Sequence, residues 1–194
     1  GALWGSWAVL AALFHREKTG QGQFIECSQI DSLLRIMDWN LVRYTAMGRI
    51  TERQGNRSNL NAPYYVSKCK DGYVIIGCAE DRIFSRLCGA MGRPELAQDS
   101  RFKTNADRVR NQIDLYRLVD KWLLEHTRDE LRGIADTHGF VYAPVMNAKD
   151  ICECEHYLER GSVVEVDDPR YGKLKLATLP PHFSAAYRRV STTG

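Results

Sequence analysis

The sequence predicts a mixed α/β protein, with an α/β opening joined to an α+β segment. Apolar residues recur at helical spacing in several stretches of the chain. Short apolar runs on either side of an Asp-Gly pair and of a Pro-x-x-Gly segment are typical of β-hairpins. The expected order is helix–strand–helix, then a hairpin and three helices, then a strand, a short helix and a second hairpin. A chain of 194 residues is long enough to bury a real core.

The first stretch, residues 3–14, is apolar on every face of a helix, which predicts a buried helix. Gly20 and Gly22 are expected to end it. The segment REKTGQGQ at 16–23 therefore predicts a helix stop. A phosphate-binding loop is disfavoured, because such loops follow a strand and open a helix. Residues 23–28 (QFIECS) predict a short strand.

The next helical pattern covers residues 30–44 and is expected to end at Gly48. Residues 49–62 (RITERQGNRSNLNA) contain three asparagines and no apolar periodicity, so we expect a loop. Loops of this length in compact proteins are often functional. Residues 64–79 predict a β-hairpin that turns at its Asp-Gly pair.

The remaining elements follow from the same patterns. Thr127 and Glu130 have the spacing of a capping box, which predicts the start of a helix that ends at Gly139. We expect helices over 83–91, 109–126, 127–139 and 148–159, a strand over 140–145 and a hairpin over 162–177.

The charge distribution argues against a nucleic-acid or membrane partner. The net charge of +3 is small and evenly spread along the chain. The densest basic cluster, from Arg101 to Arg110, alternates with acidic and polar residues, which predicts a solvated helix face. No apolar stretch reaches the length of about 18 residues that a membrane span needs.

The six cysteines do not form the framework of a secreted protein, so we expect reduced thiols and a cytoplasmic location. Cys152, Cys154 and His156 form the tightest group of metal-ligating residues. On a helix these side chains point in different directions, whereas in an extended strand they would share a face. We expect no metal and no permanently bound cofactor.

No motif in the chain identifies a catalytic group by itself. There is no G-x-G-x-x-G or Walker loop, and none of the five histidines lies in a nucleophile elbow. Glu80 follows a predicted strand and opens a predicted helix, where the dipole favours an acid. A general base is the alternative interpretation of Glu80. Asp31 has the position of a helix-capping residue.

Six segments, taken together in this order and spacing, resemble one family. They are LAALFHREKTGQGQFIECSQIDSLL, RQGN, KDGYVIIGCAEDRIFSRLCGAMGRPEL, DSRFKTNADRVRN, YAPV and ERGSVVEVDDPRYGKLKL. This pattern resembles the class III CoA-transferases, which include formyl-CoA transferase and carnitine CoA-transferase. The resemblance covers nearly the whole chain.

The resemblance implies an α/β fold that contains part of a Rossmann-like large domain and an α+β small domain. By this match, residues 1–47 belong to the large domain and a linker helix, and residues 48–145 form the small domain. Residues 146–194 form a linker that returns towards the large domain. Family members are longer than this chain, so the resemblance implies a fragment truncated at both ends.

The implied activity is acyl-CoA:carboxylate CoA transfer, with a coenzyme A thioester and a small carboxylic acid as substrates. The family nucleophile is an aspartate, which by this match lies just upstream of Gly1. The fragment alone is therefore expected to be inactive. Family members resemble one another in forming interlocked dimers, so a homodimer is expected for the full-length protein.

The resemblance also assigns a substrate-binding role to a short loop. In formyl-CoA transferase, the segment after R-x-G-N is a glycine run that covers the active site. The corresponding substrate-binding positions here are Asn59, Leu60, Asn61 and Ala62. Side chains bulkier than glycine make a stiffer loop, which argues against formate or oxalate as substrate. A surface loop without substrate contact is the alternative.

Two other functions remain open at this stage. The segment Gly77 to Glu80 resembles a pattern in α-methylacyl-CoA racemase, a relative of the same fold, which raises Glu80 as an acid/base group. The catalytic histidine and aspartate of that enzyme would lie upstream of this chain. The third hypothesis is a non-catalytic interaction module made of the small domain.

Overall fold

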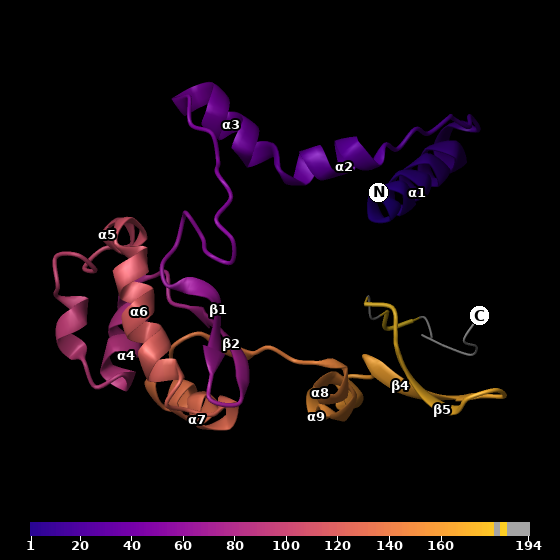
Figure 1. Ribbon diagram of the computed structural model, residues 1–194. Helices are drawn as coiled ribbons and strands as arrows, with labels where there is room; N and C mark the ends of the chain where they lie inside the picture. Colours follow the sequence, from indigo (N-terminus) through magenta and orange to yellow (C-terminus); the bar gives the residue numbers. More distant parts are fainter. Residues whose placement is uncertain (181–182, 186–194) are drawn as a thin grey trace. The chain divides into compact units, whose positions relative to one another are not determined.

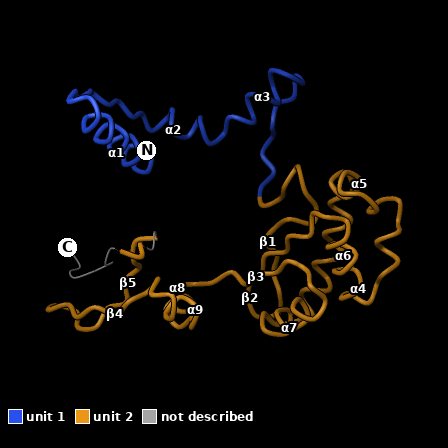
Figure 2. The backbone as a smooth tube through the Cα atoms, turned by 180° about the vertical axis from the view of Figure 1, so that it is seen from behind, with its two compact units in different colours: residues 1–55 blue, residues 56–194 orange. Residues whose placement is uncertain are grey.

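The structure is a computed structural model that describes residues 1–180 and 183–185 of the chain (Figure 1). The C-terminal RRVSTTG segment, at which we expect the truncation, lies outside the described residues. The chain divides into two compact units, residues 1–55 and residues 56–194 (Figure 2). The domain boundaries drawn from the family resemblance, at 47/48 and 145/146, concern the longer family fold and stay a prediction.

The first unit contains three helices, α1 (Ala2–Thr19), α2 (Gln29–Ile36) and α3 (Asp38–Met47). Gly20 ends α1 in the left-handed conformation, with φ at 73°, and donates its N–H to the Arg16 carbonyl. An L side chain is strained at such a φ, so glycine is favoured here. REKTGQGQ is therefore a helix stop, as predicted.

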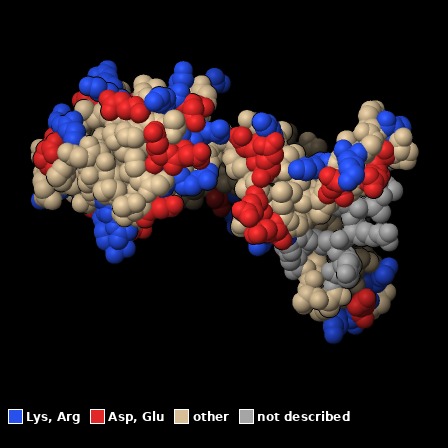
Figure 3. All heavy atoms as spheres, turned by 90° about the horizontal axis from the view of Figure 1, so that it is seen from below, with Lys and Arg blue, Asp and Glu red and all other residues tan. Residues whose placement is uncertain are grey.

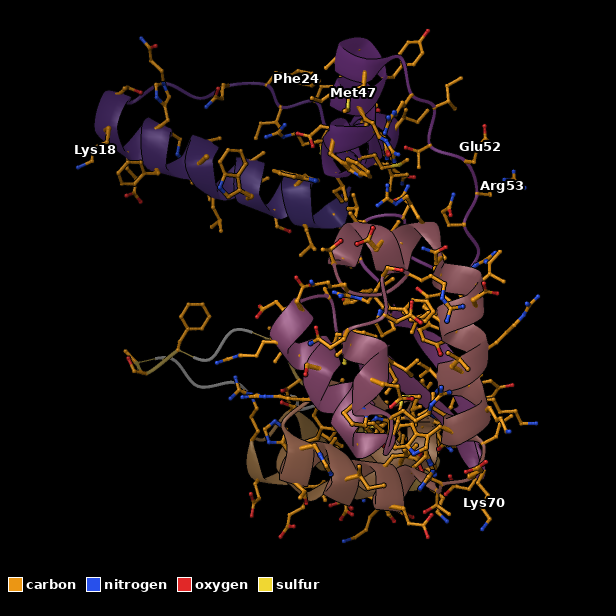
Figure 4. All side chains as sticks on the ribbon, turned by 90° about the vertical axis from the view of Figure 1, so that its left-hand side faces the viewer. Lys18, Phe24, Met47, Glu52, Arg53 and Lys70 are labelled. Carbon is orange, nitrogen blue, oxygen red and sulfur yellow. The ribbon has the colours of Figure 1, made fainter. Side chains whose placement is uncertain are left out.

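Three predictions for the first unit are wrong. Residues 23–28 form neither a helix nor a strand, and Phe24 on this segment is largely exposed (Figure 4). A strand needs a neighbour to accept its hydrogen bonds, and the described part of this unit contains no other strand. The single helix expected over 30–44 is two helices that break at Met37. None of the α1 residues is buried, although its sequence predicts a buried helix.

The second unit contains a three-stranded antiparallel sheet in the order β1-β2-β3. Its strands are β1 (Tyr64–Cys69), β2 (Gly72–Gly77) and β3 (Tyr142–Pro144). Cys69 pairs with Gly72, so the turn residues are Lys70 and Asp71, one position before the predicted Asp-Gly turn. Lys70 lies at the tip of this hairpin (Figure 4).

Helices cover one face of this sheet and form the core with it (Figure 1). The helices are α4 (Asp81–Ala90), the 3₁₀ turn η1 (Pro94–Ala97), α5 (Asn105–Arg110), α6 (Gln112–Leu123) and α7 (Arg128–His138). Buried residues alternate along β1 and β2, as in a sheet with one covered face. Val74 of β2, Phe84 of α4, Leu115 of α6 and Leu131 of α7 are among the buried apolar side chains of this core.

The helix starts of this unit follow local capping chemistry. Thr127 and Glu130 form the predicted capping box of α7, and Gly139 ends the helix in the left-handed conformation. The helix predicted over 109–126 is two helices, because the chain leaves helical geometry at Asn111. Thr104 caps α5 by accepting from the Asp107 N–H, so the helical region begins earlier than predicted.

The last described elements are α8 (Ala148–Glu153), α9 (Glu155–Glu159) and the hairpin of β4 (Val163–Asp168) and β5 (Gly172–Ala177). The helix predicted over 148–159 is interrupted at Cys154, and the predicted hairpin is present. Gly172 lies at φ 72°, the left-handed position that follows a three-residue hairpin turn. Within the described ranges, no three His, Cys, Asp or Glu side chains are grouped to hold a metal ion.

Acidic and basic side chains are interspersed on the face shown in Figure 3. Many of the pairs are local, such as Arg93 with Glu95 and Arg117 with Asp114. Exposed pairs of this kind stabilise a fold only slightly. Among the residues that the structure describes, every helix is too short or too polar to cross a bilayer.

Candidate active-site loop

Residues 57–62, hereafter the 57–62 loop, contain all the positions for which we predict substrate contact. The Ser58 hydroxyl organises the loop by accepting from the backbone N–H groups of Leu60 (3.1 Å) and Asn61 (3.2 Å). Asn59 and Asn61 are half-buried and Leu60 is exposed. Ala62 is fully buried, so it forms the base of the loop.

Helix α5 holds the base of this loop through the side chain of Asn105. The Asn105 Nδ2 donates to the Leu60 carbonyl at 2.8 Å, and the Asn105 Oδ1 accepts from the Ala62 N–H at 3.1 Å. The donor and the acceptor of this one amide side chain therefore both bond to the same short stretch of backbone. The preceding residue, Thr104, caps the helix, so the Asn105 side chain is free to bond to the loop.

Arg108, one turn further along α5, is completely buried. Its guanidinium donates to the carbonyls of Ala62 (2.6 Å), Ala79 (2.6 Å) and Phe102 (3.1 Å). It also lies 2.8 Å from a carboxylate oxygen of Asp81 and 4.5 Å from the centre of the Phe84 ring. The planar guanidinium fork, with five donors, can satisfy several fixed acceptors at once.

These contacts bring the two predicted site segments together. Arg108 bonds both to Ala62, at the base of the loop, and to Ala79, next to Glu80. The Cys78 N–H also donates directly to the Pro63 carbonyl at 2.8 Å. Glu80 is exposed at the N-cap of α4, and its side chain does not cap the helix. Hydrogen bonds therefore join the 57–62 loop to residues 78–80, hereafter the Glu80 turn.

Asn105 and Arg108 were not predicted as site residues. The solvated face predicted for the cluster from Arg101 to Arg110 is right for the exposed Arg101 and Arg110 and wrong for the buried Arg108. The spacing of three residues between Asn105 and Arg108 puts them on the same side of a helix. Nothing in the sequence shows that this side faces a loop 45 residues away.

The electrostatic environment excludes the nearby thiols as nucleophiles. Burial raises the pKa of Cys78 to about 12 and that of Cys88 to about 12. Both thiols therefore stay protonated at neutral pH, and the thiolate is the reactive form. On the outer side of α5, the Thr104 hydroxyl and then the Arg110 guanidinium lower the pKa of Asp107, so this carboxyl is ionised.

The side-chain amides of Asn59 and Asn61 make no hydrogen bond to other residues in the described part of the chain. Amide N–H groups held on an ordered loop can donate to a carboxylate or to a developing oxyanion. The arrangement therefore suits binding of an anionic oxygen group.

The chain matches the model of CoA-transferase family III over residues 1–193. It belongs to this family. The family prediction and the fold prediction are thereby confirmed.

Curated relatives of this family member include succinyl-CoA–D-citramalate CoA-transferase of Chloroflexus aurantiacus. It is 34% identical over all of this chain, which covers 48% of the relative. Human succinyl-CoA:glutarate CoA-transferase is 28% identical over 87% of this chain, with 39% of the relative covered. The chain thus spans about half the length, or less, of these relatives.

A solved structure of a CAIB/BAIF family protein from Brucella suis has the same fold. It matches with a TM-score of 0.78 at 30% identity, and the match covers 98% of this chain and 49% of that one.

Proposed function

We propose that this chain is part of an acyl-CoA:carboxylate CoA-transferase. The observation that supports it best is the family match along 1–193, together with relatives whose names describe succinyl-CoA-dependent CoA transfer. The full-length protein is the proposed enzyme. By itself the chain of residues 1–194 is expected to be inactive, because the proposed nucleophile is an aspartate upstream of Gly1.

The proposed reaction is nucleophilic catalysis in balanced steps. An aspartate oxygen attacks the carbonyl carbon of the acyl-CoA, and the CoA thiolate leaves, which gives a mixed anhydride. The thiolate attacks the aspartyl carbonyl of this anhydride and releases the donor acid as a carboxylate. The acceptor carboxylate then attacks the aspartyl-CoA thioester and displaces the thiolate. That thiolate finally attacks the acceptor carbonyl, which yields the new acyl-CoA and regenerates the aspartate.

The 57–62 loop is the proposed site of contact with the acid substrate. Asn59 and Asn61 provide the amide donors, and Leu60 provides apolar surface. Ala62 is buried and its backbone bonds to Asn105 and Arg108, so its proposed contribution is indirect: it fixes the base of the loop. Succinyl-CoA is the proposed donor and a dicarboxylic acid the proposed acceptor, by similarity to the relatives.

The direct test incubates the full-length protein with succinyl-CoA and each acid in the relatives' names: citramalate, malate, glutarate and mesaconate. Mass spectrometry should detect a new CoA thioester that forms only when an acid is added. Replacing the upstream aspartate with alanine should abolish it. If no acid yields a thioester with succinyl-CoA or with another acyl-CoA, the proposal is wrong.

Glu80 distinguishes this proposal from a racemase. Glu80 is exposed and directly follows Ala79, whose carbonyl shares the Arg108 guanidinium with Ala62 of the loop, so an acid/base role remains the specific alternative. A racemase would incorporate deuterium at the α-carbon of a 2-methylacyl-CoA in deuterated water without any acceptor acid. We expect no incorporation, and we expect Glu80→Gln to retain CoA transfer. Incorporation that disappears in Glu80→Gln would support the racemase.

The assembly and location are also proposals. We propose a homodimer, in which the exposed apolar side chains of α1 and α2, such as Phe14 and Leu33, are covered by other parts of the assembled protein. We propose a cytoplasmic location, because all six cysteines have free thiols. Size-exclusion chromatography with light scattering of the full-length protein tests the dimer, and a monomer would contradict it.

A further inference from the structure

We infer that helix α5 is a clamp that fixes the conformation of the 57–62 loop, with Asn105 and Arg108 as positioning residues for acceptor-acid binding. This inference rests on the proposed transferase function. Neither residue needs to touch the substrate, because both act through the backbone of the loop.

The hydrogen bonds of the loop support this inference. Ser58 bonds only within the loop, to the N–H groups of Leu60 and Asn61. Within the described ranges, every hydrogen bond from residues 58–62 to the rest of the unit ends on α5. These bonds join Leu60 and Ala62 to Asn105, and Ala62 to Arg108. Arg57, the first residue of the loop, pairs with Tyr65 of β1 in an isolated bridge. The conformation of residues 58–62 therefore depends on two side chains of one short helix.

Arg108 extends the clamp to the second site segment. The same guanidinium that binds the Ala62 carbonyl binds the Ala79 carbonyl and pairs with Asp81 at the start of α4. A buried arginine with several fixed acceptors has little freedom to move, since each displacement would leave a buried carbonyl without a donor. The spacing between the loop and the Glu80 turn is thereby set by one rigid group.

This geometry has a kinetic consequence. Small displacements of substrate-positioning groups can reduce catalysis by as much as about a hundredfold. If Asn59 and Asn61 bind the acceptor acid, loosening the clamp should mainly weaken acceptor binding. Binding of the acyl-CoA donor should change much less when Asn105 is replaced, because both side-chain hydrogen bonds of Asn105 go to this loop.

A matched pair of variants in the full-length enzyme tests the clamp. Asn105→Ala removes both hydrogen bonds to the loop. Asn111→Ala removes two similar bonds, from the Asn111 side chain to the carbonyls of Arg101 (3.1 Å) and Asp107 (3.0 Å), which do not reach the loop. Both variants should lower the melting temperature similarly.

Only Asn105→Ala should raise the KM for the acceptor acid, by about tenfold or more. We expect Asn111→Ala to change it by less than about twofold. Equal kinetic effects of the two variants, or an unchanged KM in Asn105→Ala, would overturn the inference. Arg108→Lys provides a second variant that keeps the charge and loses the planar fork, and it should raise the same KM.

Hydrogen exchange separates failure of the clamp from failure of the proposed function. The Ala62 amide donates to Asn105, so its exchange should be faster in Asn105→Ala than in Asn111→Ala. Equal exchange rates would overturn the clamp whatever the enzyme does. If exchange accelerates but the wild-type enzyme transfers no CoA, the proposed function and its assigned role for the clamp are both wrong.

Discussion

Helices α1 and α6 both carry apolar residues at helical spacing, on every face in α1 and on one face in α6, yet they differ in burial. Leu115, Val119 and Leu123 on α6 are fully buried against the sheet, whereas Leu3, Leu10 and Phe14 on α1 are all more than half exposed. Helix α6 packs on β1. Helix α1 has no such packing surface within its own unit, where no residue of α1 is buried.

Apolar periodicity therefore predicts that a helix packs against other elements. It does not predict which elements these are. Most helical stability in proteins comes from packing of the apolar face. In the second unit the covering elements are present in the same unit. In the first unit the pattern is present without its cover. The contrast can be tested by measuring stability in both units.

The largest expected difference is between two phenylalanines. Phe84 is 2% exposed in the core and Phe14 is 65% exposed on α1. Phe84→Ala should lower the free energy of unfolding by about 3–5 kcal/mol, because it opens a cavity. Phe14→Ala should lower it by less than about 1 kcal/mol. Urea denaturation of the 194-residue chain measures both, and equal losses would contradict the contrast.

The next difference is between two arginines. Arg108→Met should destabilise the second unit by about 3 kcal/mol, since it leaves buried carbonyls without donors. Arg35 on α2 pairs with Asp38, and both side chains are exposed. Arg35→Met should cost about 0.5 kcal/mol or less, because exposed pairs are weak. A cost for Arg35→Met close to that for Arg108→Met, again by urea denaturation, would refute this prediction.

A smaller difference is expected for two helix caps. Thr127→Ala removes the capping box of α7 and should cost about 1 kcal/mol of unfolding free energy in the second unit. Ser28→Ala removes the cap of α2, where the bond to the Asp31 N–H is 3.4 Å long. It should leave hydrogen exchange of the β2 amides unchanged. Because Thr127→Ala destabilises the second unit, it should speed hydrogen exchange of the β2 amides. Unchanged or slower exchange in Thr127→Ala, or faster exchange in Ser28→Ala, would contradict this expectation.

The smallest effect concerns pH. The Asn147 backbone N–H and then the Arg128 guanidinium lower the pKa of Asp150. A carboxyl with a lowered folded-state pKa stabilises the fold above its unfolded pKa of about 3.9, and this stabilisation is lost as the pH falls through the folded value. Asp150→Asn should therefore flatten the fall in stability below about pH 4. An unchanged pH profile would show that the Arg128–Asp150 contact contributes nothing.

Much of the second unit could be predicted from local patterns. The hairpin at 64–79 and the capping box at Thr127 follow from turn and cap chemistry, which depends on neighbouring residues only. Helix breaks at Met37, Asn111 and Cys154 were not predicted, because apolar periodicity continues across a short break. The strand expected at 23–28 failed for a different reason, since strands need partners that the segment itself does not specify.

The candidate site divides in the same way. The composition of the 57–62 loop and the position of Glu80 at a helix start are visible in the sequence. The contacts of Asn105 and Arg108 with that loop are not, because they join residues 45 and 46 positions apart.

The two hairpins, the capping box of α7, the helix stop at Gly20 and the resemblance to the class III CoA-transferases follow from the sequence alone. Each depends on residues close together or on the order of motifs along the chain. Which apolar helices are covered, and the complete burial of Arg108, can be seen only in the packed structure. Burial is a property of the whole packed unit, so the same arginine can be solvated or enclosed according to which distant carbonyls the fold brings to it.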